Sequence, residues 1–187
     1  LIDDKITIYL NDGLNLPSWT PTVIDSAIGH SKSIIAVDID NDGLMDILTA
    51  TQYSNNIALY KNTGSDNSSW SYITIDQNIY GATRVAAADI NQDGNLDIIS
   101  SASYSDGIFL HEAIDNSILN WSTTTIFNEA DFAYDVFIED LDNDNDLDIL
   151  SASFNDNSIR WHENNGGQEP IFNTILISDN EDGAACV

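Results

Sequence analysis

The sequence repeats itself every 51 residues without an insertion or deletion, and this internal period constrains the fold more than any other feature. Isoleucines, aspartates and large aromatic residues each recur at a fixed phase of the period. The aromatic series consists of Trp19, Trp70, Trp121 and Phe172. The chain therefore divides into three full repeats, residues 1–51, 52–102 and 103–153, and a partial repeat, residues 154–187.

Each repeat contains four short segments with the pattern of β-strands. In the first period they are residues 33–39, 46–51, 56–62 and 71–76, separated by clusters of Asn, Ser, Asp and Gly. No segment has a helical period. Four short strands in about 50 residues are typical of a propeller blade, and a single blade must be covered by its neighbours. We therefore expect an all-β fold of four-stranded antiparallel β-propeller blades, with residues 1–187 forming a single propeller segment.

The phase of the repeat predicts how the blades are cut by the ends of the chain. Three complete blades are expected between residues 33 and 178, with two outer strands of another blade in residues 1–25. The last residues, up to Val187, share the phase of Ile34, Val85 and Val136 and are expected to begin a further inner strand. Propellers close with 4 to 8 blades. We therefore expect additional blades, either in a longer chain or in other copies in an assembly.

The charge of the chain is strongly unbalanced, with 31 acidic residues against 5 basic ones and a net charge of −26. Such a surface repels nucleic acids and anionic lipid headgroups and attracts cations. The sequence has no apolar run of 18 residues, so no membrane span is expected. Cys186 is the single cysteine, so no disulfide can form within the chain. Stability must come from another source, and bound metal is one such source.

Each repeat carries one acidic loop between its first two strands. We call residues 38–46 loop one, residues 89–97 loop two and residues 140–148 loop three. They share the pattern D-x-[DN]-x-D-[GN]-x-x-D. Crowded carboxylates repel one another unless a cation lies among them. Three such loops in register favour metal sites over solvated acidic turns.

The spacing within each loop predicts a calcium site. Side-chain oxygens at positions 1, 3, 5 and 9 and the backbone carbonyl at position 7 can surround one ion, as in the first part of an EF-hand loop. Position 6 must turn sharply, and Gly or Asn tolerates the positive φ this needs. Hard oxygen ligands without His or Cys favour Ca²⁺ over Zn²⁺, and Mg²⁺ demands a tighter octahedron. We expect three Ca²⁺ ions, one per loop. The expected ligands are Asp38, Asp40, Asp42, Leu44, Asp46, Asp89, Asn91, Asp93, Asn95, Asp97, Asp140, Asp142, Asp144, Asp146 and Asp148.

Two of the loops depart from the common pattern. Loop two has Asn91 at position 3 and therefore one carboxylate fewer, which predicts weaker binding. Loop three has Asn145 at position 6, where Gly is expected, and Asp146 at the carbonyl position. We expect loop three to bind with altered affinity.

The chain resembles the FG-GAP/VCBS repeat family, whose propeller repeats are related to the head of integrin α-subunits. Residues 37–48 (VDIDNDGLMDIL), 88–99 (ADINQDGNLDII) and 139–150 (EDLDNDNDLDIL) carry the resemblance, together with the outer-strand segment 159–166. The resemblance implies a propeller, usually of seven blades, with Ca²⁺ in loops on one rim. It also implies an extracellular setting, in adhesins, surface proteins and accessory modules of polysaccharide-degrading enzymes.

These observations favour a non-catalytic calcium-binding module, secreted or at the cell surface of a bacterium, that serves adhesion, ligand binding or structural assembly. Three alternatives stay open: a carbohydrate-binding, lectin-like propeller, a structural subunit of a surface fibre, and an accessory propeller of a polysaccharide-active enzyme. We expect no catalytic residues and no cofactor other than Ca²⁺. The ligand, a protein or a glycan, is not identified by the sequence. The variable loops 29–32, 80–83 and 131–134 are the expected recognition surface.

The remaining candidate residues have stronger structural than functional interpretations. The aromatic series can stack on sugars, but packing between adjacent blades once per repeat is favoured. His111 and His162 share the phase of Tyr9 and Tyr60, which indicates a structural position on an outer strand. No Ser/His/Asp arrangement independent of the repeat stands out.

Overall fold

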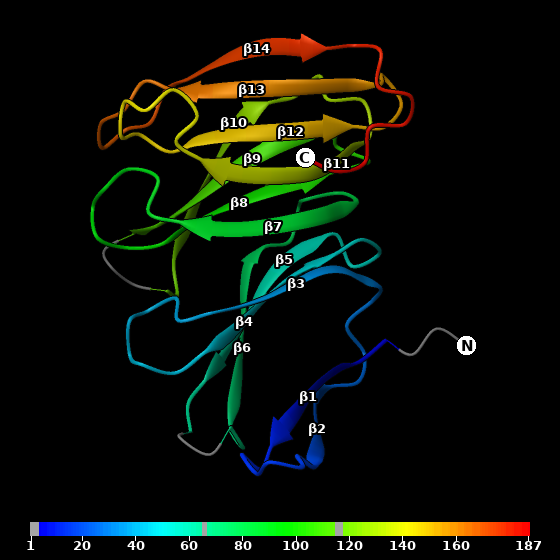
Figure 1. The fold of residues 1–187 in the computed structure, drawn as a ribbon, viewed down its shortest axis with the longest axis vertical. Coiled ribbons are helices and arrows are strands. Elements are labelled where there is room, and N and C mark those ends of the chain that lie inside the picture. The colour runs from blue at the N-terminus through cyan, green and yellow to red at the C-terminus, as the bar shows by residue number, and fades with distance from the viewer. Residues whose placement is uncertain (1–3, 65–66, 115–117) are drawn as a thin grey trace.

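The structure is a computed structural model that describes residues 4–64, 67–114 and 118–187. These residues form three four-stranded antiparallel sheets and one two-stranded sheet (Figure 1). Within the described ranges, no helix is long and apolar enough to cross a membrane. The two-stranded sheet pairs β1 (Ile6–Asn11) with β2 (Trp19–Asp25). The first full sheet holds β3 (Ser31–Val37), β4 (Asp46–Thr51), β5 (Asn56–Asn62) and β6 (Trp70–Asp76).

The second and third sheets repeat the first at the same phase. The second holds β7 (Ala82–Ala88), β8 (Asp97–Ala102), β9 (Gly107–Ala113) and β10 (Trp121–Phe127). The third holds β11 (Ala133–Glu139), β12 (Asp148–Ser153), β13 (Ser158–Asn164) and β14 (Phe172–Ser178). In each sheet the strands pair in chain order, so every connection is a hairpin. The predicted bounds of β4 and β5 are confirmed. The strand predicted for residues 33–39 both begins and ends earlier, as β3, and β6 begins slightly earlier than predicted.

The sheets stack on one another in the manner of propeller blades. The first strands of successive sheets lie side by side, with β3 beside β7 and β7 beside β11. Figure 1 shows the sheets following one another along the long axis of the molecule, from β1 and β2 at one end to β14 at the other. This arrangement confirms the predicted all-β, blade-like architecture.

Each full sheet carries register shifts at equivalent positions. The pairing of its first two strands shifts between Ser31 and Ser33, between Ala82 and Arg84, and between Ala133 and Asp135. A second shift falls where the third and fourth strands pair, for example between Ile57 and Ala58. Bulges of this kind increase the local twist of a strand pair. The register shifts therefore recur once per repeat, at equivalent positions of each blade.

The hydrophobic core lies between the sheets. Leu48, Ile57 and Leu59 of the first sheet are completely buried and pack in one cluster with Val85 and Ile98 of the second. An equivalent cluster joins the second and third sheets. Its buried members are Ile90, Ile99, Ile108, Leu110, Ala130, Ala133, Val136 and Ile149. Since a sheet is apolar on both faces here, no blade can be stable without a neighbour.

The aromatic series packs between blades, which confirms the interpretation favoured from the sequence. Trp70 packs against the cluster of Ile6, Ile28, Ile47 and Tyr60. Trp121 and Phe172 pack against the next two inter-blade clusters in the same way. The indole nitrogens of Trp70 and Trp121 each donate a hydrogen bond to a carbonyl three residues earlier in the chain. Within this series Trp19 differs, because 56% of its surface is exposed.

The prediction that the last residues begin an inner strand is wrong, because residues 179–187 contain no strand. A strand requires ladder hydrogen bonds to a neighbour, and the described chain supplies no further strand to pair with these residues. Val187 nevertheless keeps the position that the 51-residue repeat predicts for it beside the preceding blade. The backbone N–H of Val187 donates to Oδ2 of Asp135 at 3.2 Å, just as that of Val85 donates to Oγ of Ser33 at 3.3 Å.

Candidate metal centres in the acidic loops

All three acidic loops are folded around the carboxylate at position 1. Asp38 accepts the backbone N–H groups of Asp42 at 3.0 Å and Gly43 at 2.9 Å. The same pair of bonds forms at Asp89 and at Asp140, with distances between 3.0 and 3.2 Å. One carboxylate therefore satisfies two amide groups at the tip of each loop and fixes its curvature.

Left-handed backbone conformations occur at two positions of each loop. At position 6, φ is 86° at Gly43, 92° at Gly94 and 75° at Asn145, which confirms the conformation expected for these residues. The backbone at position 4 is also left-handed, which the loop pattern did not predict. The residues at position 4 are Asn41, Gln92 and Asn143. Asn is enriched in this conformation, so two of the three carry a signal that could have indicated it.

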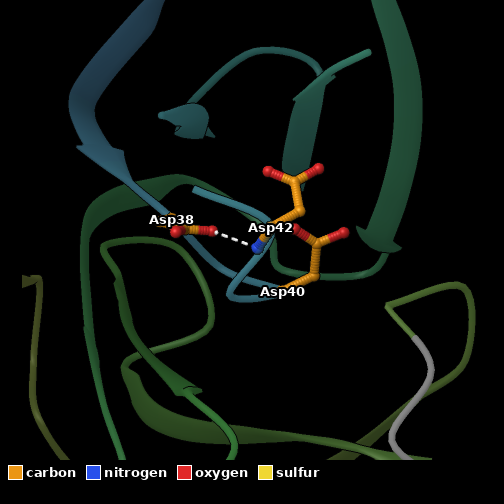
Figure 2. Close-up of side chains that lie close together, drawn as sticks. All are labelled: Asp38, Asp40 and Asp42. Atoms are coloured by element: carbon orange, nitrogen blue, oxygen red, sulfur yellow. Dashed lines mark hydrogen bonds between the residues drawn. The ribbon is translucent and has the colours of Figure 1, made fainter. Parts of the chain in front are cut away.

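Loop one gathers three of its predicted ligands into a small cluster. One carboxylate oxygen from each of Asp38, Asp40 and Asp42 lies within 4.8 Å of the other two. Figure 2 shows these side chains gathered on one turn, with Asp38 bonded to the backbone nitrogen of Asp42. Oδ1 of Asp40 is buried, and no hydrogen-bond donor within the described residues reaches it. A buried carboxylate oxygen without a donor, among other hard oxygens, fits a cation ligand.

Loop three gathers a different set of three carboxylates. Asp140, Asp142 and Asp148 lie within 4.8 Å of one another, counting one oxygen from each. Asp144 lies outside this cluster and accepts the backbone N–H of Asp146 at 2.9 Å, a bond that Asp42 also makes in loop one. The carboxylate of Asp146 accepts a hydrogen bond from Nε2 of Gln92, in loop two, at 2.9 Å. Loops two and three are therefore in direct contact across the blade boundary.

Loop two does not bring three carboxylates this close together within the described residues. Position 3 is Asn91, whose Oδ1 accepts the backbone N–H of Asp93 at 3.0 Å. Oδ1 of Asp93 accepts both the backbone and the side-chain N–H groups of Asn95. Loop three makes the same backbone bonds at Asp142 and Asp144, so loop two keeps the loop geometry and differs in lacking a carboxylate at position 3.

The aspartates at position 9 lie at the start of the second strand of each blade and are almost completely buried. Asp46, Asp97 and Asp148 each accept the backbone N–H of loop position 2, at 3.0 to 3.3 Å. Burial raises the pKa of Asp46 above its usual value. It raises the pKa of Asp97 to about 7, with the carboxylate of Glu112 adding to the effect. A cation bound nearby would favour the ionised form of these buried groups.

Two charged residues from the third strand of the blade belong to the sites and were missed from the sequence. Nζ of Lys61 contacts Oδ2 of Asp40 and lies 3.0 Å from Oδ2 of Asp42. This ammonium lowers the pKa of Asp42. In the next blade the equivalent residue is Glu112, whose Oε1 accepts from Nδ2 of Asn91 at 3.3 Å. The 51-residue period relates the two positions, but the period alone does not place them beside the loop.

The whole predicted ligand set stays a prediction, including the aspartates of the two clusters, which are close enough together to share an ion. The backbone carbonyls of Leu44, Asn95 and Asp146 stay predicted ligands at position 7. So do the side chains of the residues that lie outside the two clusters of three: Asp46, Asp89, Asn91, Asp93, Asp97 and Asp144. The predicted identity of the ion, Ca²⁺, also stays a prediction.

A chain of polar groups resembles a catalytic relay in its order, but its serine and histidine are buried within the sheet. Nε2 of His111 lies 2.8 Å from Oγ of Ser100, and Nδ1 lies 2.9 Å from Oγ1 of Thr123, which donates to Asp76. His162 makes the equivalent contacts with Ser151 and Thr174. Ser100 and His111 have no exposed surface, so these contacts tie β8, β9 and β10 together, and the bond from Thr123 to Asp76 joins the second sheet to the first.

The stacked four-stranded sheets and the acidic loop between the first two strands of each define a β-propeller repeat protein with candidate metal-binding loops. A family model described as FG-GAP-like repeat matches residues 2–49 and 38–100, just over half of the chain. The chain therefore belongs to the FG-GAP-like repeat family. The comparison with curated proteins found no match.

A solved structure supports the fold assignment. It is described as the structural basis of specific recognition of non-reducing terminal N-acetylglucosamine by a lectin of Agrocybe aegerita. The TM-score is 0.61 at 18% sequence identity, and the match covers 94% of this chain and 48% of that lectin. The chain thus spans about half the length of the lectin, and at this identity the likeness shows the fold alone.

Proposed function

We propose that this chain is a non-catalytic, calcium-binding repeat module of a secreted or cell-surface protein, with residues 1–187 acting as one propeller segment. The observation that carries the proposal is the carboxylate cluster of Asp38, Asp40 and Asp42, in which Oδ1 of Asp40 is buried without a hydrogen-bond donor among the described residues. The same loop architecture recurs in all three repeats.

Calcium would act on both charge and folding. The net charge of −26 opposes compaction, and divalent ions in the loops would offset part of it. Because the loops assemble only when the first two strands of a blade pair, ion binding is linked to folding. Extracellular calcium modules have dissociation constants of about 10⁻⁴ to 10⁻³ M, so such sites fill outside cells.

Thermal melting with and without metal tests the proposal. The melting temperature should rise by several degrees in millimolar Ca²⁺, fall again with a chelator, and change little with Zn²⁺. Mg²⁺ at the same concentration controls for ionic strength and for divalent charge. A melting temperature that Ca²⁺ raises no more than Mg²⁺ does would contradict the proposal.

A second candidate function, glycan recognition, is favoured by a pocket between blades. The pocket has a volume of about 180 Å³, and its lining includes Asp25, Asn56, Tyr60 and Tyr72. Tyr72 is 51% exposed, and its hydroxyl accepts from Nδ2 of Asn56 at 2.9 Å. Exposed aromatic rings beside carboxylate and amide groups suit the apolar and hydroxyl faces of a sugar.

A related pocket occurs one repeat later. Its lining includes Asp76 and Thr123, which stand at the positions of Asp25 and Tyr72. Between the second and third blades, Phe127 of β10 takes the position of the aspartate, so the pocket chemistry is not kept there. The solved lectin recognises N-acetylglucosamine, which makes this sugar the first ligand to test.

Titration with N-acetylglucosamine, followed by NMR chemical shifts, tests the second candidate. Shifts are expected at residues lining the pocket of Asp25 and Tyr72, and Tyr72→Ala should abolish them. Tyr104→Ala serves as a control, because Tyr104 is 57% exposed but lies in the second blade and does not line this pocket. The absence of shifts at millimolar sugar, or equal loss in both variants, would rule out glycan binding at this pocket.

A further inference from the structure

The acidic loops differ in the charge that the third strand of the blade presents to them. Lys61 lies one residue before the end of β5, and 21% of its side chain is exposed. Its ammonium contacts the carboxylates of both Asp40 and Asp42. These are two of the three aspartates that loop one gathers into its cluster. A cationic group of the chain itself therefore lies against the predicted calcium position of loop one.

The other two blades carry the opposite charge at this position. The period of 51 residues places Glu112 in the second blade and Glu163 in the third. Glu112 lies at loop two, with Oε1 3.3 Å from Nδ2 of Asn91. Asn91 is the residue that replaces the expected aspartate, so Glu112 brings a carboxylate to the point where loop two lacks one. Oε2 of Glu163 instead accepts from Nδ2 of Asn173, at 3.0 Å.

The contacts of Lys61 and Glu112 have opposite consequences for a divalent cation. An ammonium that contacts two ligand carboxylates occupies their lone pairs and repels an incoming positive charge. It can withdraw, since the flexible four-carbon stem of a lysine lets the charged end move into water. A fourth carboxylate at loop two strengthens the attraction of that site and adds a hard oxygen donor.

We propose that the residue at this strand position sets the calcium affinity of each loop. Lys61 is an internal counter-ion that the metal must displace from loop one, and Glu112 is a ligand of loop two in place of the aspartate missing at Asn91. This inference rests on the proposed calcium function and deepens it. It reverses the order that the loop sequences alone predict, because loop one has the complete ligand pattern and loop two does not.

The geometry at Asp40 supports displacement rather than permanent closure of loop one. Lys61 contacts Oδ2 of Asp40, whereas the buried Oδ1 has no hydrogen-bond donor among the described residues. The internal ion pair thus leaves one oxygen of the site unsatisfied. A divalent ion that replaced the ammonium could bind that oxygen, so loop one should fill at higher Ca²⁺ concentration than loops two and three.

Calcium titration followed by the amide resonances of Gly43, Gly94 and Asn145 tests the inference, because each residue reports on one loop. In the unmodified chain Gly43 should respond at a Ca²⁺ concentration at least tenfold higher than Gly94. Lys61→Glu, which installs the residue of the other two blades, should lower the midpoint at Gly43 at least tenfold. Lys61→Met, which keeps the stem and removes the charge, should give a smaller decrease and also covers the case that Lys61→Glu fails to fold.

Glu112 is tested by the matching changes in the second blade. Glu112→Gln should raise the midpoint at Gly94 several-fold, and Glu112→Lys should raise it further. Lys32→Glu is the control for net charge, since it changes the charge as Lys61→Glu does but lies near the start of β3, at the opposite end of the strand from loop one. Lys32→Glu should leave all three midpoints nearly unchanged.

The outcomes separate the inference from the proposed function. If all three loops respond at one Ca²⁺ concentration, or if Lys61→Glu and Lys61→Met leave the Gly43 midpoint unchanged, the role of Lys61 is refuted while calcium binding stands. An unchanged Gly94 midpoint in both Glu112 variants refutes the role of Glu112 in the same way. If no loop of the unmodified chain responds and melting is insensitive to Ca²⁺, the proposed function itself fails.

Discussion

The hydroxyl of Tyr60 donates a hydrogen bond of 2.7 Å to Oδ2 of Asp25 and so joins the first full blade to the strand pair before it. The second blade makes the corresponding link differently. There His111 replaces the tyrosine, and Thr123 bridges it to Asp76. Residues at the same position of the repeat thus link neighbouring sheets in both blades, but through different side chains. The exposed Tyr9 of β1 stands at this phase as well.

Removing the hydroxyl of Tyr60 should destabilise the fold. Tyr60→Phe leaves the carboxylate of Asp25 without this donor at a partly buried position, and we expect a loss of about 1–3 kcal/mol in the free energy of unfolding. Urea denaturation measures the effect. Tyr9→Phe is the matched control, because Tyr9 is 61% exposed, and it should change stability by less than about 0.5 kcal/mol. Equal effects in the two variants would show that the hydrogen bond contributes nothing.

The buried histidines should make the fold sensitive to mild acid. Burial lowers the pKa of both His111 and His162 to about 4, from the usual 6.5. At these two histidines the unfolded chain therefore binds more protons than the native state between pH 6.5 and 4, and their contribution to stability falls as the pH is lowered through this window. Within this window each histidine should lower the free energy of unfolding by up to about 1.4 kcal/mol for each pH unit of acidification. The raised pKa of the buried Asp97 acts in the opposite direction, so the histidine contribution is read from the difference between variants.

Melting between pH 7 and 5 in the unmodified chain and in His111→Gln with His162→Gln measures this dependence. The double variant should be less stable at pH 7 but should lose less stability on acidification. His30→Gln is the control, since His30 stands at a different phase of the repeat. If the double variant and the unmodified chain lose stability in parallel, the buried histidines do not cause the acid sensitivity.

Each loop should bind its ion independently of the others, because the ligands of each loop, including Glu112 for loop two, come from a single blade. Asp93→Ala should remove the calcium response of Gly94 and preserve those of Gly43 and Asn145. Gln92, which contacts loop three, is left intact in this variant. Calorimetric titration should show the loss of one site. Loss of every site from this single change would contradict independence.

Because the backbone at position 6 is left-handed, any residue with a Cβ atom should lower the free energy of unfolding when it replaces the glycine there. Gly94 has φ of 92° and open space around the position of an added Cβ, so only the backbone opposes substitution. Gly94→Ala should destabilise the fold by about 1–2 kcal/mol. In loop three the reverse change, Asn145→Gly, should be neutral or stabilising by up to about 1 kcal/mol. An Ala at position 94 that leaves chemical denaturation unchanged would argue against this loop geometry.

The inter-blade core should dominate stability. Ile98 is completely buried in the cluster between the first two full blades, and Ile98→Ala should cost about 2–5 kcal/mol. Leu16→Ala is the control, because Leu16 is 91% exposed. Both changes remove an aliphatic side chain. If Leu16→Ala lowered the free energy of unfolding as much as Ile98→Ala, the inter-blade cluster would not be the main source of stability.

The sequence by itself determined the repeating unit of this protein. Its exact period predicted four strands per repeat, the bounds of β4 and β5, and the packing of Trp70 and Trp121 between blades. These features depend on local alternation, on turn residues and on position within the period, all of which can be read along the chain. The left-handed backbone at Gly43 and Gly94 was predictable for the same reason, because it depends on the residue itself.

Tertiary structure alone decided what faces each acidic loop. Lys61 and Asp40 are 21 residues apart, and only the pairing of β4 with β5 brings the lysine back to the loop. The deep burial of Asp46 and Asp97 likewise requires the neighbouring strands. The difference between the loops therefore comes from charge brought across the sheet. Electrostatic attraction depends on the distance between charges in space. The spacing of residues along one segment does not give that distance.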